Sequence, residues 1–227
     1  MNSNEPLAYR MRPKTLDEYV GQEHVLGKDK ILYRTIKADR LSSIILFGPP
    51  GCGKTSLAKV ISETTKYKFY KINAVTAGVS EIKKVIEETK NFMLNPSGKS
   101  ILFIDEIHRF NKLQQDALLP YVENGTIILI GATTENPYFE VNKALISRSM
   151  VIKLNPLTNE DIYKILKNAL KRNDGLGEYN IKIEDETLRK IATISNGDVR
   201  TALNGLEVAT LTTTMSEDGF IHLTDEV

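Results

Sequence analysis

In the first two thirds of the chain, short continuous apolar runs alternate with longer amphipathic segments. Five runs are apolar at successive positions, as expected of parallel strands covered on both faces. They are Ser43–Phe47, Lys68–Asn73, Ser100–Asp105, Thr126–Ala132 and Met150–Leu154. Helices are predicted at Thr55–Thr65, Ser80–Asn91, Lys112–Glu123 and Asn142–Ile146. This alternation predicts a doubly wound α/β domain over residues 1–154, a parallel sheet with helices on both faces and an N-terminal arm that wraps the sheet.

The pattern becomes helical after Asn155. One apolar stripe at spacings of three and four predicts a first helix, formed by Ile162, Ile165, Leu166, Ala169 and Leu170. A second helix is predicted near Asp185–Ser195 and a third near Asp198–Leu211, followed by an extended segment at 219–223. We therefore expect a small all-α domain over residues 155–227. Because residues 224–226 have the pattern of a helix start, we expect this domain to be truncated at its C-terminal end.

Composition removes several classes of protein. The 227 residues are 41% hydrophobic and 26% charged, and no run approaches the roughly 18 apolar residues of a membrane helix. The N-terminus lacks an apolar signal region, which favours a cytoplasmic setting. Cys52 is the single cysteine, so an internal disulfide is excluded, and the three histidines lack the spacing of zinc ligands. The net charge of +1 gives no overall basic footprint for nucleic acid.

A phosphate-binding loop is the strongest chemical signal. Residues 48–55 read GPPGCGKT, which matches G-x-x-x-x-G-K-[ST] between a strand and a helix. Glycines let successive backbone N–H groups face phosphate oxygens, and the helix adds its positive N-terminal end. We expect Lys54 to reach the β- and γ-phosphates and Thr55 to ligate Mg²⁺. The whole set is Gly48, Pro49, Pro50, Gly51, Cys52, Gly53, Lys54, Thr55 and Ser56. The alternative, a turn that binds nothing, leaves the lysine and hydroxyl unexplained.

Two carboxylates end the apolar run that precedes Ile107. Asp105 is expected to hold Mg²⁺, and Glu106 to orient and polarise the attacking water. Acidic residues at a strand end are often merely solvated, but here they follow a complete phosphate loop. An adjacent water-directing carboxylate favours hydrolysis over phosphorylation of a small molecule.

Three further positions are candidates for contact with the γ-phosphate. Thr133 and Thr134 follow a predicted buried strand, where a polar side chain would lie beside the attacking water, and the alternative role of either threonine is to cap a turn. Arg148 would enter a neighbouring subunit's site as an arginine finger, or else is a solvated residue at a helix end. Arg200 lies on the polar face of the third helix of the second domain, where it would fold back onto the γ-phosphate or remain an ordinary surface arginine.

Taken in order, these motifs resemble those of the AAA+ ATPases. Within them, the chain is similar to the replication-associated recombination protein A family, also called RarA or MgsA, and to the Werner-helicase-interacting ATPases. The segments that carry the resemblance are Leu7–His24, Asp105–Lys112 (DEIHRFNK), Gly131–Glu140 (GATTENPYFE), LISRS and GDVRTAL. The phosphate loop is common to many NTPases, whereas the second and third segments narrow the family.

The resemblance implies an AAA+ domain with a helical lid, ATP and Mg²⁺ as cofactors, and ATP-dependent action on DNA in fork maintenance, recombination and repair. It implies DNA forks, ends or gaps, a single-strand DNA-binding protein and further copies of the chain as partners. Thr134 would match the sensor 1 position, Arg148 the trans-acting finger and Arg200 the sensor 2 arginine. The residues that would border the adenine are Arg10, Arg12, Pro13, Tyr19, Val20 and Gly21.

Two alternative functions stay open. A clamp-loader-like scaffold subunit would bind nucleotide for assembly and turn over little. A P-loop kinase of small molecules is disfavoured by the separate helical domain and by Arg148 and Arg200, which suit an ATPase that senses its neighbours.

Overall fold

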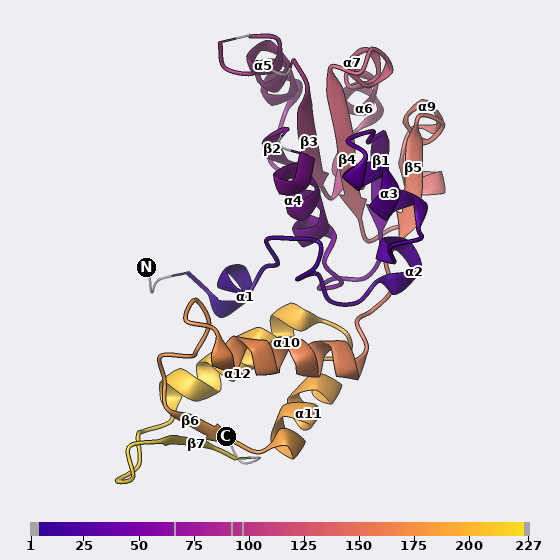
Figure 1. Cartoon of the computed structure of the whole chain (residues 1–227). Helices are drawn as coiled ribbons and strands as arrows, with labels where there is room; N and C mark the ends of the chain where they lie inside the picture. Colours follow the sequence, from indigo (N-terminus) through magenta and orange to yellow (C-terminus); the bar gives the residue numbers. More distant parts are fainter. Residues whose placement is uncertain (1–4, 66, 92, 97, 225–227) are drawn as a thin grey trace.

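A five-stranded parallel sheet forms one half of the protein in the computed structural model, which describes residues 5–65, 67–91, 93–96 and 98–224 (Figure 1). Its strands are β1 (Ser43–Phe47), β2 (Lys68–Asn73), β3 (Ser100–Asp105), β4 (Ile127–Thr133) and β5 (Ser149–Lys153). They lie in the order β2-β3-β4-β1-β5, and every neighbouring pair is parallel. The predicted sheet is therefore confirmed, with strand ends shifted by one residue in β4 and β5.

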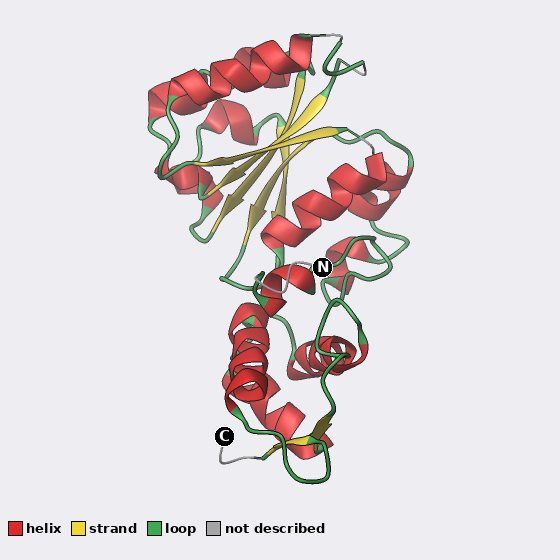
Figure 2. Cartoon of the chain, turned by 90° about the vertical axis from the view of Figure 1, so that its left-hand side faces the viewer, coloured by secondary structure: helices red, strands yellow, loops and turns green. Residues whose placement is uncertain are grey.

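Helices cover both faces of this sheet, as Figure 2 shows. One face packs against α3 (Ile31–Lys37) and α4 (Lys54–Thr65) through residues such as Ile44 and Phe103. The other face packs, through residues such as Ile45 and Ile104, mainly against α5 (Val79–Lys90), η1 (Ile107–Arg109), α7 (Leu119–Glu123) and α9 (Lys143–Ile146). A short α6 (Lys112–Asp116) lies between η1 and α7 in the chain. A short α8 (Pro137–Glu140) follows β4. Because successive strand residues point to opposite faces, the continuous apolar runs fill two separate cores.

The single helix predicted over Lys112–Glu123 is two helices in the structure. α6 ends at Asp116, and α7 begins at Leu119 with Pro120 in its first turn. Proline has no backbone N–H, and its ring clashes with the carbonyl of the residue four positions earlier. Pro120 is therefore accommodated at a helix start and divides the predicted helix.

The second half of the molecule is a helical lid. Its helices α10 (Asn159–Lys171), α11 (Asp185–Ile194) and α12 (Val199–Thr212) pack around one apolar core. The expected helical unit is confirmed, but it is not all-α, because β6 (Ile181–Ile183) and β7 (Ile221–Leu223) form a short parallel pair. The helix start expected at residues 224–226 falls largely outside the described residues. None of the described helices is long and apolar enough to cross a membrane.

The N-terminal arm joins the two halves instead of only wrapping the sheet. In α1 (Leu7–Arg10), Leu7 is fully buried in the lid core, where it packs with Met11 against α12. Farther along, Tyr19 and α2 (Glu23–Leu26) pack against the sheet side. The first part of the arm thus packs in the lid core and the following part packs against the sheet, because the first apolar residues of the arm contact the lid helices. The division of the chain at residue 154 stays a prediction.

Candidate functional site

The carboxyl ends of the parallel strands meet at the edge of the sheet that faces the lid (Figure 1). The loop that begins at Gly48 leaves β1 there and enters α4 at Lys54. Its start is fixed to the neighbouring strand, because the Gly48 N–H donates to the Thr133 carbonyl at 3.2 Å. Asp105 ends β3 at the same edge. The fold therefore brings the phosphate-loop sequence and the acidic strand end together, as parallel α/β sheets do at their ligand sites.

Two glycines of the loop are needed where they stand. Gly51 has a φ of +68° and Gly53 one of +100°, in the left-handed region that disfavours other residues. A Cβ would also collide with Asp198 at Gly51 and with the Tyr19 hydroxyl at Gly53. Among the described residues, neither backbone N–H donates a hydrogen bond. Unpaired N–H groups at the start of a helix fit an anionic phosphate.

The Lys54 side chain lies inside the loop. Its Nζ donates to the Gly48 and Pro49 carbonyls, at 2.7 Å each, and lies 3.9 Å from the Cys52 sulfur. The lysine is 8% exposed, so a cation is held within reach of any phosphate that binds the loop. Cys52 is also buried, and burial raises the pKa of its thiol. It therefore acts as a small neutral residue, as its place in the motif predicts.

Oxygen donors suited to Mg²⁺ stand beside the loop. Thr55 is in the first turn of α4, one residue after Lys54, and Asp105 ends β3. The Asp105 carboxylate lies 3.6 Å from the Lys71 Nζ on β2, so it has a cationic partner in the protein itself. A hydroxyl and a carboxylate are hard oxygen ligands of the kind Mg²⁺ takes together with phosphate oxygens. The donor set fits the predicted metal.

Glu106 has an unusual backbone and two neighbours that the sequence did not reveal. Its φ is +56°, a left-handed conformation that is costly for a residue with a side chain. Its Oε2 lies 3.4 Å from Nδ1 of His108, and that nitrogen lies 2.8 Å from the Thr133 hydroxyl. Thr133 is fully buried, whereas Thr134, the predicted sensor, is exposed directly after β4. The sequence assigned His108 no role at the site, because its partners come together only when β3 pairs with β4.

The lid reaches the loop through the first turn of α12. Asp198 caps this helix, accepting from the Arg200 backbone N–H at 2.8 Å, and its carboxylate also packs against Gly51. Arg200 is exposed two residues further on, and its charge partly offsets the rise that burial causes in the pKa of Cys52. Arg200 therefore lies on the loop side of the lid. Asp198 was not among the predicted site residues, although an aspartate at the start of a predicted helix is a common helix cap.

The arm supplies the other wall of the loop. The Tyr19 hydroxyl donates to the Gly53 carbonyl at 3.1 Å, and burial raises the pKa of this phenol. Val20 and Gly21 follow, and a Cβ at Gly21 would lie 2.8 Å from Leu157 of the lid segment. These three residues therefore lie between the loop and the lid, where the resemblance placed the adenine, and that role stays a prediction.

Gln22 is a further residue of the site that sequence reasoning missed. Its amide donates to the Asn155 carbonyl at 2.7 Å and its Oε1 accepts from the Asn155 backbone N–H at 2.9 Å. The same amide lies 3.4 Å from the Cys52 carbonyl. Gln22 therefore ties the loop to the point where the chain passes into the lid. A lone glutamine carries no motif, so only the fold identifies this role.

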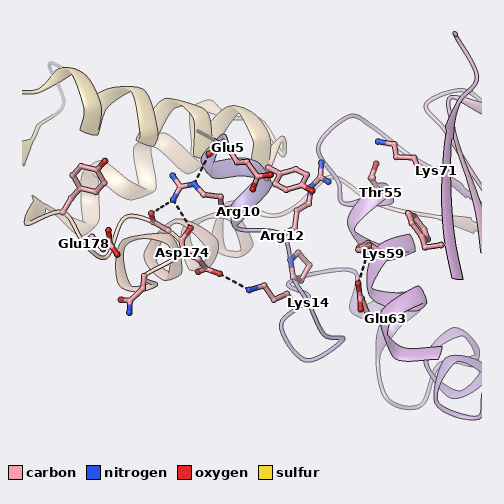
Figure 3. A pocket seen from close by; sticks show the side chains of 16 residues that line it. Glu5, Arg10, Arg12, Lys14, Thr55, Lys59, Glu63, Lys71, Asp174 and Glu178 are labelled. Carbon is pink, nitrogen blue, oxygen red and sulfur yellow. Dashed lines mark hydrogen bonds and ion pairs between the residues drawn. The ribbon is translucent and has the colours of Figure 1, made fainter. Parts of the chain in front are cut away.

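A cleft of about 860 Å³ opens between the arm, α4, β2 and the lid (Figure 3). Thr55 and Lys71 line it on the sheet side, and Arg12 and Pro13 line it on the arm side. Arg10 also lines the cleft, but its guanidinium donates to Glu207 at 2.9 Å and to two lid carbonyls. Arg10 thus fastens the arm to the lid, and its predicted place beside the adenine stays a prediction.

Arg148 lies far from this edge in its own chain. It precedes β5, so it sits at the amino ends of the strands, opposite the loop. Its guanidinium pairs with Glu123 at 2.7 Å and also donates to the Ala144 carbonyl. This position rules out contact with the chain's own loop and leaves contact with a neighbouring copy as the predicted role.

Comparison with known proteins agrees with this geometry. The family model described as "ATPase family associated with various cellular activities (AAA)" matches residues 44–157, and an "RCF1/5-like, AAA+ ATPase lid domain" model matches residues 178–211. Replication-associated recombination protein A of Bacillus subtilis is 48% identical over 98% of the chain, and that of Escherichia coli K12 is 51% identical over 91%. The chain spans about half the length of these relatives, 52% and 46% respectively.

Among solved structures, the RuvB Holliday junction branch migration motor of Thermotoga maritima superposes with a TM-score of 0.75 at 28% identity. The match covers 93% of this chain and 69% of that one, so it includes both the sheet and the lid. The resemblance drawn from the motifs is confirmed. With the family model covering half of its length and the loop, acidic strand end and lid in place, the chain belongs to the ATPase family associated with various cellular activities.

Proposed function

We propose that the chain binds ATP with Mg²⁺ and hydrolyses it at the loop edge of the sheet. The observation that carries the proposal is the convergence of Lys54, Asp105 and Glu106 at one edge, beneath a lid that contacts the loop. Lys54 would hold the β- and γ-phosphates, and Thr55 with Asp105 would hold Mg²⁺. The metal would neutralise charge on the phosphate oxygens.

Glu106 is the proposed water-directing base, and Thr134 and Arg200 the proposed γ-phosphate contacts. Glu106 directly follows Asp105, the proposed metal ligand, and this supports a position for its side chain beside the reacting phosphate. Thr134 follows β4 at the same edge, and Arg200 comes from the lid side. Because Arg200 belongs to the lid, loss of the γ-phosphate by hydrolysis would change the contacts that hold the lid in place.

The position of Arg148 supports an assembly of several copies. At the opposite edge from the loop, the guanidinium cannot contact a nucleotide bound to its own chain, and the side chain is 41% exposed, so a neighbouring copy can reach it. In such an assembly, each Arg148 would stabilise the transition state in the next subunit. We therefore propose a homo-oligomer in which hydrolysis is coupled to movements between subunits.

The substrate is proposed from the relatives. Both bacterial relatives carry replication and recombination in their names, and the structural neighbour is described as a Holliday junction motor. We propose that the chain acts on DNA at forks, ends or gaps in the cytoplasm, in association with the nucleoid if its source is a bacterium, with a single-strand DNA-binding protein as partner. DNA would stimulate the ATPase activity.

The test is phosphate release from ATP, measured alone and with single-stranded, forked and gapped DNA. Glu106→Gln should keep ATP binding, followed with a fluorescent analogue, and lower turnover by about 100-fold or more, in the range of a lost general base. Unchanged turnover would remove Glu106 from this role. ATP binding without turnover under any DNA condition would favour the scaffold alternative, and phosphate found on an acceptor other than water would reveal a kinase.

A further inference from the structure

His108 is a histidine that the proposed chemistry does not use, yet it lies against the proposed base. It occupies η1, two residues after Glu106, and its side chain is only 10% exposed. Its Nδ1 lies 3.4 Å from Glu106 Oε2 and 2.8 Å from Thr133 Oγ1. The other two histidines have partners elsewhere: His24 Nε2 lies 3.0 Å from the Lys153 carbonyl oxygen, and His222 Nε2 lies 2.9 Å from Asp218 Oδ2.

The hydrogen-bonding capacity of these groups allows two arrangements. The Thr133 oxygen already accepts from the Glu135 N–H at 2.9 Å, so its own hydrogen is available for His108. If Nδ1 carries a proton, it donates toward Thr133 and Glu106 together, because an ionised carboxylate only accepts. If Nδ1 carries none, it accepts from the Thr133 hydroxyl and releases Glu106. Among the described residues, Nδ1 therefore connects the Glu106 carboxylate to the end of β4.

β4 connects this atom to the phosphate edge. Thr133 is the last residue of the strand, its carbonyl accepts from the Gly48 N–H, and Thr134 follows at once. The backbone of Glu106 has a left-handed conformation, with a φ of +56°, and this conformation fixes the direction in which the side chain leaves the backbone. A strained residue at a candidate site that is also held by a buried neighbour is a sign of a required orientation.

We propose that His108 is a positioning residue for Glu106, holding the carboxylate to the end of β4 so that the base is oriented together with the loop and Thr134. The kinetic part of this inference rests on the proposed hydrolysis, whereas the hydrogen-bonded chain itself is independent of it. His108 acts through Glu106 and is not assigned any contact with nucleotide.

Four substitutions separate positioning from packing. His108→Phe keeps a ring without a hydrogen-bonding nitrogen, His108→Asn restores a polar nitrogen near the place of Nδ1, and His108→Gln puts one near the place of Nε2. His222→Phe is the matched control on the lid. We expect His108→Phe and His108→Gln to lower kcat by roughly 10- to 100-fold, the loss of one hydrogen bond to a charged group. ATP affinity should stay within about twofold, and His108→Asn should recover most of the turnover.

The kinetic result would overturn the proposal if His108→Phe turned over like wild type, or if His108→Asn and His108→Phe were equally impaired. The second result would mean that the ring only fills space. A fall in ATP affinity that accounts for the whole loss would also overturn it, because a positioning residue for the base changes kcat.

A second measurement needs no turnover. With only three histidines, ¹⁵N-histidine labelling gives a resolved ring spectrum, and the His108→Phe variant assigns the His108 signals. Glu106→Gln and Thr133→Val should each shift the His108 Nδ1 resonance while those of His24 and His222 stay in place. An Nδ1 resonance unmoved by both variants would show that the chain of contacts is absent, even if the protein proved to be an active ATPase.

Discussion

Removal of the Glu207 side chain should weaken the attachment of the arm to the lid. This carboxylate accepts from the Arg10 guanidinium at 2.9 Å through one oxygen and from the Leu7 backbone N–H at 2.8 Å through the other. Both side chains of the pair are less than one-fifth exposed. Glu207→Ala therefore leaves a half-buried guanidinium without its counter-ion and a backbone donor at a buried residue without an acceptor.

The magnitude follows from these two losses. A hydrogen bond to a charged group contributes about 1.5–3 kcal/mol, and a buried donor left unpaired costs about 1–3 kcal/mol. Arg10 keeps its bonds to the Asp174 and Gly175 carbonyls, so the two losses will not add fully. We expect a destabilisation of about 3 kcal/mol, which for a chain of this size corresponds to a fall in Tm of roughly 6–12 °C.

The assay is thermal unfolding followed by circular dichroism at the helix band, since the chain has no tryptophan. Glu160→Ala is the matched control, because Glu160 also pairs with an arginine, Arg189, at 2.8 Å, but both side chains are more than half exposed. That pair contributes at most about 1 kcal/mol. Glu207→Gln should fall between the two, because its amide oxygen still accepts from Leu7. Equal shifts for Glu207→Ala and Glu160→Ala would refute the role of the arm as a lid element.

Three further outcomes follow from the site and its surroundings. Gly51→Ala should lower nucleotide affinity by at least about tenfold, measured with a fluorescent analogue, because its φ is positive and its Cβ would meet Asp198; unchanged affinity would contradict the loop geometry. Arg148→Ala should keep ATP binding but reduce turnover in mixed assemblies more than in proportion to the mutant fraction, and a strictly proportional fall would argue against a finger acting between subunits. The guanidinium of Arg172 holds the pKa of Asp174 far below its usual range, so this carboxylate stabilises the fold above its unfolded pKa of about 4, and the contribution is lost as the pH falls below that value. Asp174→Asn should therefore flatten the acid side of a plot of Tm against pH, and identical plots for the variant and the wild type would count against the pair.

The sheet could be predicted from sequence because its information is local. Each strand is an apolar run between turn residues, and the loop at residues 48–55 identifies the run before it as a strand and the segment after it as a helix. The break at Pro120 was also local, since a proline in the middle of a predicted helix is evidence against continuity. By contrast, β6 and β7 are three residues each and about 40 positions apart, so no periodicity along the chain announces their pairing.

The candidate site divides in the same way. Lys54, Asp105 and Glu106 belong to motifs whose spacing carries the chemistry, so their roles were predicted before the fold was known. His108 and Gln22 lie in segments that carry the family resemblance, but no spacing in those segments indicates what their side chains contact. His108 depends on Thr133, 25 positions away, and Gln22 on Asn155, 133 positions away. Contacts of that separation exist only after the strands have paired, and sequence reasoning on a single chain has no access to them.

The contacts around the loop couple its conformation to the position of the lid. Gly51 faces Asp198 of the lid, Gly53 faces Tyr19 of the arm, and the Cys52 carbonyl faces Gln22, which also holds Asn155. All three contacts are made by consecutive residues of one short loop. A phosphate that binds one loop conformation more tightly than another would therefore shift the arm and the lid directly, without a path through the sheet. The size of the shift would follow from the difference in phosphate affinity between the two loop conformations.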